Sequence, residues 1–64
     1  MKISYKVKDC YGNIEKYTLH NVASWKDEKS PHDPYVLRIL RDASGKALAG
    51  PMVGQFFDFV ESQD

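Results

Sequence analysis

The sequence predicts a mainly β fold in a single small domain spanning residues 1–64: an antiparallel curled sheet or open barrel of about five strands. Two observations favour this class. Residues 9–13 and 42–46 share the pattern Asp-x-x-Gly-polar, and each segment is flanked by strand-like sequence. This pattern is typical of a three-residue hairpin loop, because Asp favours the first turn position and Gly the left-handed residue. Apolar and polar residues also alternate beside the first loop, as in a half-buried strand.

The first hairpin can be given a register. If Asp9 lies opposite Asn13, then Tyr5 lies opposite Tyr17, and the two faces of the hairpin separate cleanly. The face predicted to be core carries Ile3, Tyr5, Val7, Tyr17 and Leu19. The face predicted to meet solvent carries Lys2, Ser4, Lys6, Lys8, Ile14, Lys16, Thr18 and His20.

The second hairpin contains a strand that is apolar on both faces, residues 35–41. Such a strand is expected at the centre of a sheet, with both faces covered. With Asp42 opposite Lys46, the predicted pairs are Leu40–Leu48, Ile39–Ala49 and Val36–Met52. Gly50 and Pro51 end the pairing or mark a bulge, because proline has no donor for the ladder.

The remaining segments are less regular. Residues 22–28 either continue the second strand past a kink or form a short extra strand, and residues 29–34, with two prolines, form a loop. Residues 53–61 combine helical spacing of apolar residues with strongly strand-prone composition. We expect a strand there; the alternative is an α+β fold, a four-stranded antiparallel sheet with a short C-terminal helix.

Composition excludes several classes of protein. Nine basic and nine acidic residues give a net charge of zero, unlike a generally basic nucleic-acid binder, an acidic DNA mimic or a polybasic membrane peptide. No apolar run is long enough to span a membrane, and no secretory signal is expected. A short chain with one cysteine and no internal disulfide favours a reducing compartment, so the predicted location is cytoplasmic.

Enzymatic chemistry is not expected. Cys10 is the only thiol, and the hairpin register separates it from His20 by roughly 26 Å, too far for a Cys–His pair. Cys10, His20, His32 and Asp33 lack the spacing of a metal site. We therefore predict no catalytic residue, no metal site and no cofactor.

Aromatic residues favour a protein-interaction module instead. Tyr11, Trp25 and Tyr35 flank turns or loops, where side chains are often exposed, and Tyr and Trp are enriched at binding hot spots. A short single domain with two tight hairpins is similar in general character to accessory proteins of phages and mobile elements. The primary hypothesis is that the chain is a non-enzymatic inhibitor or modulator of a larger protein. We expect the chain itself to form a homo-oligomer, with a dimer as the favoured state.

Two alternatives stay open. A stripe of positive residues on the first hairpin favours a small β domain that binds single-stranded nucleic acid with a basic groove and stacking aromatics; its members are Lys2, Lys6, Lys8, Lys16 and His20. The other alternative is an oligomer that sequesters a small ligand at a subunit interface, although no sequence motif supports it.

Overall fold

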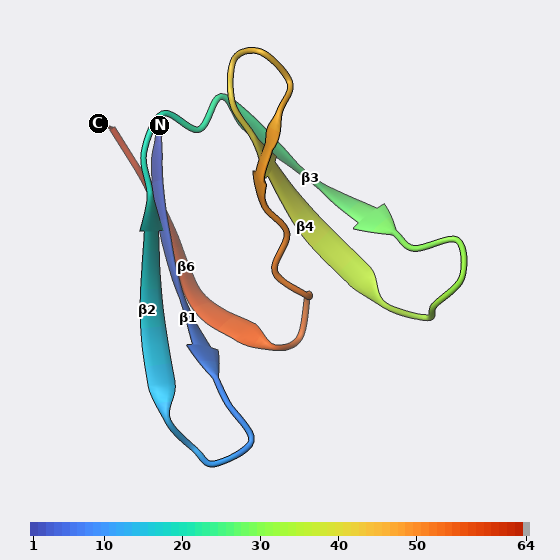
Figure 1. Ribbon diagram of the computed structural model, residues 1–64. Helices are drawn as coiled ribbons and strands as arrows, with labels where there is room; N and C mark the ends of the chain where they lie inside the picture. The colour runs from blue at the N-terminus through green and yellow to red at the C-terminus, as the bar shows by residue number, and fades with distance from the viewer. Residues whose placement is uncertain (64) are drawn as a thin grey trace.

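The computed structural model describes residues 1–63, and its strands form two three-stranded antiparallel sheets with the orders β2-β1-β6 and β3-β4-β5 (Figure 1). The strands are β1 (Lys2–Lys8), β2 (Ile14–Leu19), β3 (Ser24–Lys29), β4 (Val36–Arg41), β5 (Ala47–Ala49) and β6 (Phe56–Ser62). The mainly β class is confirmed, although the sheets do not close into a barrel. The alternative with a C-terminal helix is wrong, because residues 56–62 form a strand.

The first hairpin has the predicted register. Tyr5 pairs with Tyr17 and Ile3 with Leu19. The Asp9 backbone N–H donates to the Asn13 carbonyl at 2.9 Å, and the Asp9 carboxylate accepts the N–H groups of two loop residues at 2.8 and 2.9 Å. Gly12 supplies the positive φ, 84°, that completes the turn.

The second hairpin has the predicted turn and a different register. The Asp42 N–H donates to the Lys46 carbonyl at 3.0 Å, as expected. The three pairs predicted beyond this turn are wrong by one residue. Arg41 lies opposite Ala47 and Leu40 opposite Ala49, so Leu48 is the extra residue of a β-bulge. The same offset places Leu37, in place of Val36, opposite Met52.

The segment between the hairpins forms a separate strand, β3, which lies in the second sheet. Asn21 adopts a left-handed conformation (φ 60°) directly after β2 and redirects the chain. The N–H of the buried Val22 then donates to the Met1 carbonyl at 2.9 Å, and the Ala23 N–H donates to the Arg41 carbonyl at 2.8 Å. This short connection joins the two sheets, and β4 takes the predicted central position between β3 and β5.

A second bulge shapes β6. The register between β1 and β6 shifts between Ser4 and Lys6, where Asp58 has a positive φ of 53°. The bulge allows Phe56 and Phe59 to pack against the core, while Phe57 stays 39% exposed. One extra residue therefore decides which phenylalanine side chains lie inside.

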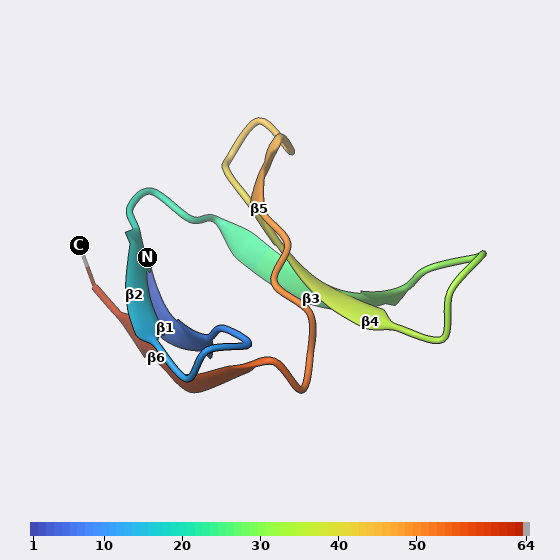
Figure 2. The ribbon, with the colours of Figure 1, turned by 60° about the horizontal axis from the view of Figure 1, so that its bottom comes forward.

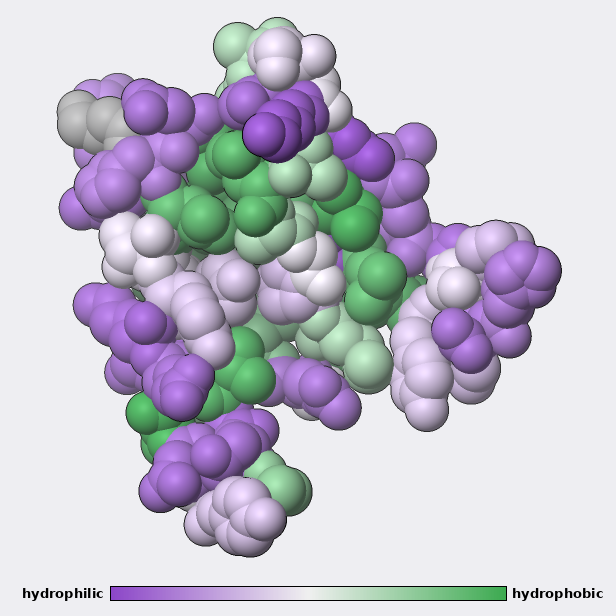
Figure 3. Space-filling model, in the orientation of Figure 1, coloured by the Kyte–Doolittle hydropathy of each residue, from purple (hydrophilic) through white to green (hydrophobic). Residues whose placement is uncertain are grey.

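The core is small. Within residues 1–63 four hydrophobic side chains are buried, those of Ile3, Tyr5, Val22 and Leu40, and five others pack against them: Val7, Leu19, Trp25, Phe56 and Phe59. The two sheets lie apart as two wings (Figure 2), and the molecule measures 33 × 28 × 13 Å. Apolar surface gathers between hydrophilic hairpin ends (Figure 3).

The protein exposes more surface and has a larger radius of gyration than a compact domain of the same size. It exposes 4673 Å², against about 4,200 Å² for a compact monomer of this mass. Its radius of gyration is 12.1 Å, against about 10.7 Å for a compact domain of this length. About 500 Å² per chain is thus exposed beyond what a compact fold leaves in water.

Candidate protein-interaction surface

Trp25, a predicted interaction residue, lies between the two sheets. Its ring meets the Phe59 ring edge-on, with centroids 5.3 Å apart, and its indole N–H donates to Glu61 of β6. The Arg38 guanidinium lies 4.2 Å from the indole centroid, on the side of β4. Trp25 therefore joins the two sheets through its contacts with β6 and β4.

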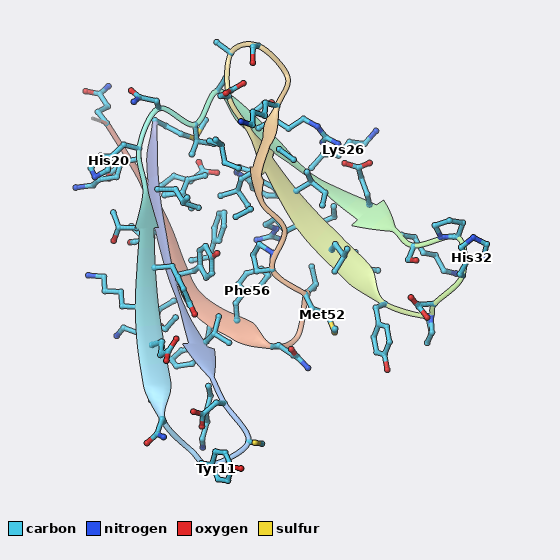
Figure 4. The ribbon with its side chains drawn as sticks, viewed as in Figure 1. Tyr11, His20, Lys26, His32, Met52 and Phe56 are labelled. Carbon is cyan, nitrogen blue, oxygen red and sulfur yellow. The ribbon has the colours of Figure 1, made fainter. Side chains whose placement is uncertain are left out.

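The other two predicted interaction residues are exposed but distant from each other. Tyr11 is 87% exposed at the tip of the first hairpin, and Tyr35 is 50% exposed in the loop directly before β4. In Figure 4 Tyr11 lies at the lower end of the first sheet, whereas the loop before β4, marked by His32, lies at the far end of the second. The fold does not bring them into one patch.

The four lysines of the predicted stripe do share one face. Lys2, Lys6 and Lys8 alternate along β1, and Lys16 of β2 lies directly opposite Lys6. The side chain of Lys6 forms an ion pair with Asp58, Nζ to Oδ2, at 3.2 Å. His20 follows the end of β2, at the opposite end of the hairpin from Tyr11 (Figure 4).

Apolar side chains lie among these lysines. Ile14 is 57% exposed and pairs with Lys8; Phe57 pairs with Lys6. Val60 is 53% exposed and pairs with Ser4. Opposed residues of an antiparallel pair point to the same side of the sheet. We call this side the lysine face: Lys2, Ser4, Lys6, Lys8, Ile14, Lys16, Thr18, Phe57 and Val60.

Sequence reasoning missed Phe57 and Val60 as members of this face. The phenylalanines of residues 53–61 are expected from the sequence to lie mostly in the core, whether the segment is a strand or a helix. The cause is the bulge at Asp58. Asp tolerates positive φ, but no Gly or Pro marks this position as a bulge in the sequence.

The charges of the two sheets are arranged differently. In the second sheet, Arg38 donates to Asp27 (Nε–Oδ1 2.7 Å, Nη2–Oδ2 3.1 Å), and Arg41 donates to Glu28 at 2.7 Å. On the lysine face, the ion pairs within residues 1–63 are limited to Lys6 with Asp58. Like charges directly opposite each other, as at Lys6 and Lys16, destabilise a sheet. This face therefore carries positive charge that an acidic partner can neutralise.

Three of the groups with shifted pKa values belong to hydrogen-bonded surface pairs, whereas burial raises the pKa of Tyr5. The Arg38 bonds lower the pKa of the Asp27 carboxyl, and the Ser44 hydroxyl lowers that of Asp42. The Tyr17 hydroxyl donates to Glu15 at 2.7 Å, and this carboxylate raises the pKa of Tyr17. None of these three groups lies in an enclosed cavity, where an acid or base catalyst is usually found.

The one thiol borders an open hollow of about 650 Å³ between residues 7–10 and 54–57. Cys10 is exposed there. The turn that contains it, His20 and His32 lie at three separate ends of the molecule (Figure 4). Among residues 1–63, no three His, Cys, Asp or Glu side chains come together in a group that can hold a metal ion.

Comparison with known protein families, curated proteins and solved structures finds no match for this chain. Within residues 1–63 there is also no helix of the length and apolar character needed to cross a membrane.

Proposed function

We propose that this chain is a non-enzymatic protein-interaction module of the cytoplasm, which inhibits or modulates a larger protein and docks through the lysine face. The observation that carries this proposal is the exposure of Ile14, Phe57 and Val60 on the same sheet face as four lysines. Apolar side chains supply the energy of an interface when they are desolvated, and the charges around them supply orientation and association rate.

The chemistry of this face defines the partner. Three exposed apolar side chains on two edge strands flank a positive central strand, β1. A complementary surface has apolar side chains at two places and Asp or Glu side chains between them. The openness of the fold supports the same proposal, because a partner on this face or a second copy of the chain buries surface that the small core leaves exposed.

The test is affinity capture from a lysate of the native host with matched charge variants. Lys8→Glu/Lys16→Glu reverses two charges on the lysine face. Lys26→Glu/Lys46→Glu makes the same change of net charge on the second sheet and its turn. We expect the wild type and the second variant to retain a stoichiometric protein through nuclease treatment, and the first variant to lose it.

Phe57 adds one specific observation in favour of the nucleic-acid alternative. An aromatic side chain beside lysines on an open sheet face can stack a base, whereas Ile14 and Val60 offer no ring. Binding that disappears on nuclease treatment and falls steeply with salt would replace the protein partner by single-stranded nucleic acid. Equal loss of capture in both charge variants would show that net charge, and not this face, is responsible.

A further inference from the structure

The two sheets have four open edges, and three of them carry features that prevent further strand pairing. β3 has four consecutive charged residues, 26–29. β5 has three residues and a bulge, and Gly50 and Pro51 follow it. β6 is bulged at Asp58. Charge, shortness, bulges and proline are the devices by which proteins block edge-to-edge association.

The edge of β2 differs from the other three. It is six residues long, regular along its whole pairing with β1, and free of Gly and Pro. Five of its six residues are exposed. Its two charges, on Glu15 and Lys16, are of opposite sign. This strand is therefore the one open edge in residues 1–63 that is suited to accept another strand.

The turn fixes which backbone groups of β2 face outward. Asp9 and Asn13 form a hydrogen-bonded pair, and such pairs alternate with non-hydrogen-bonded pairs along an antiparallel ladder. The N–H and C=O groups of Ile14, Lys16 and Thr18 therefore point away from β1. A second β2 strand can pair only through these same three residues, which restricts the possible registers.

We propose that two copies of this chain pair antiparallel through β2, around a two-fold axis at Tyr17. In this register Lys16 of each copy lies opposite Thr18 of the other. Moving the axis to Lys16 or to Glu15 places identical charges directly opposite each other, which destabilises a sheet. Moving it to Thr18 shortens the paired segment. The Tyr17 register avoids both penalties.

The arrangement also uses the aromatic side chains of the first sheet. Tyr17 is 43% exposed and stacks on the buried Tyr5, with ring centroids 5.5 Å apart. Tyr17 would be a non-hydrogen-bonded pair with its symmetry mate, the closer of the two types. The two stacks then meet in one row of four rings. If each chain lost its excess exposed surface of about 500 Å², the dimer would bury about 1,000 Å² in total, the lower end of specific interfaces.

This inference rests on the expectation that the interaction module forms a dimer. It is tested with the purified chain, so that its outcome is independent of partner capture. Sedimentation equilibrium over a wide concentration range should give twice the chain mass of 7.3 kDa. Thr18→Glu, which faces Lys16 of the other copy, should tighten the dimer, and Thr18→Lys should weaken it. The expected changes in dissociation constant are roughly three- to tenfold in opposite directions.

A cross-link tests the register itself. Tyr17→Cys in a Cys10→Ser background should form an intermolecular disulfide on mild oxidation, because the Cα atoms of a non-hydrogen-bonded pair lie about 4.5 Å apart, within the disulfide range. Thr18→Cys in the same background should not, since it faces Lys16. A chain that stays monomeric at the highest concentration overturns the proposal. So do equal effects of the two Thr18 charge variants, or more efficient cross-linking at position 18 than at 17.

Discussion

Arg38 is predicted to contribute more to stability than an ordinary surface arginine. Its guanidinium lies 4.2 Å from the Trp25 ring centroid, 4.7 Å from that of Phe59 and 5.1 Å from that of Phe56. Its side chain is 18% exposed. A cation–ring contact contributes about 0.5–1 kcal/mol at an exposed site and about 2 kcal/mol when desolvated. Because one cation serves all three rings, we expect Arg38→Ala to cost about 2 kcal/mol in total.

This loss is large for such a small core, which supplies roughly 3–5 kcal/mol. With a urea m-value of about 1 kcal/mol/M, the unfolding midpoint of Arg38→Ala should fall by about 2 M. The measurement is urea unfolding followed by Trp25 fluorescence and by circular dichroism.

Arg41→Ala is the matched control. Arg41 belongs to the same strand and has an ion pair of the same 2.7 Å length, with Glu28. The cation–ring contacts found in residues 1–63 all belong to Arg38. Loss of a largely exposed ion pair costs about 0.2–1 kcal/mol, so the urea midpoint of Arg41→Ala should fall by at most about half as much. Equal losses in the two variants would refute the contribution of the rings.

Three further predictions concern the turn, the core and pH. Gly45→Ala should cost about 1 kcal/mol, because Gly45 has a φ of 88°, and should lower the melting temperature by roughly 4–8 °C. Leu40→Ala, at a side chain with no exposed surface, should cost about 2–5 kcal/mol and leave the chain largely unfolded in circular dichroism. Asp27 and Asp42 have lowered pKa values in the fold. Their contribution to stability is therefore present above the ordinary Asp pKa of 3.8 and lost as pH falls through the lower folded values. Urea midpoints measured between about pH 6 and about pH 2 should show this decline.

Each of these predictions has a matched comparison. Gly45→Asn should be milder than Gly45→Ala, since Asn tolerates positive φ; equal losses would show that turn geometry is not the cause. Val60→Ala, at a 53% exposed side chain, should leave stability almost unchanged, and a cost like that of Leu40→Ala would contradict the assignment of the core. Asp27→Asn/Asp42→Asn should flatten the acid decline, and an unchanged slope would assign it to other carboxylates.

The parts of the fold that followed from the sequence are those set by local rules. The Asp-x-x-Gly turn and the alternation beside it fix the Tyr5–Tyr17 register, because a slip by one residue would exchange the two faces. The central place of β4 follows from its apolar residues on both faces. Both rules depend on residues only a few positions apart.

The parts that did not follow depend on single irregular residues. Leu48 and Asp58 each add one residue to a strand, and Asn21 turns the chain toward a second sheet. None of these positions is Gly or Pro. Asn and Asp tolerate positive φ more readily than other residues, but this tolerance alone does not predict where a bulge or a change of sheet will lie. The candidate surface was affected in the same way. Its lysines could be predicted from the first hairpin, whereas Phe57 joins them only because of the bulge in β6.

The openness of the fold has a thermodynamic consequence. The heat-capacity change of unfolding arises mainly from newly hydrated apolar surface, and here much of that surface is in water before unfolding begins. The heat-capacity change of unfolding of the isolated chain should therefore be smaller than the usual value of roughly 12–15 cal/mol/K per residue. Its stability curve should be shallow in temperature and its calorimetric transition broad. Association with a partner, or with a second copy, should raise the heat-capacity change and sharpen the transition.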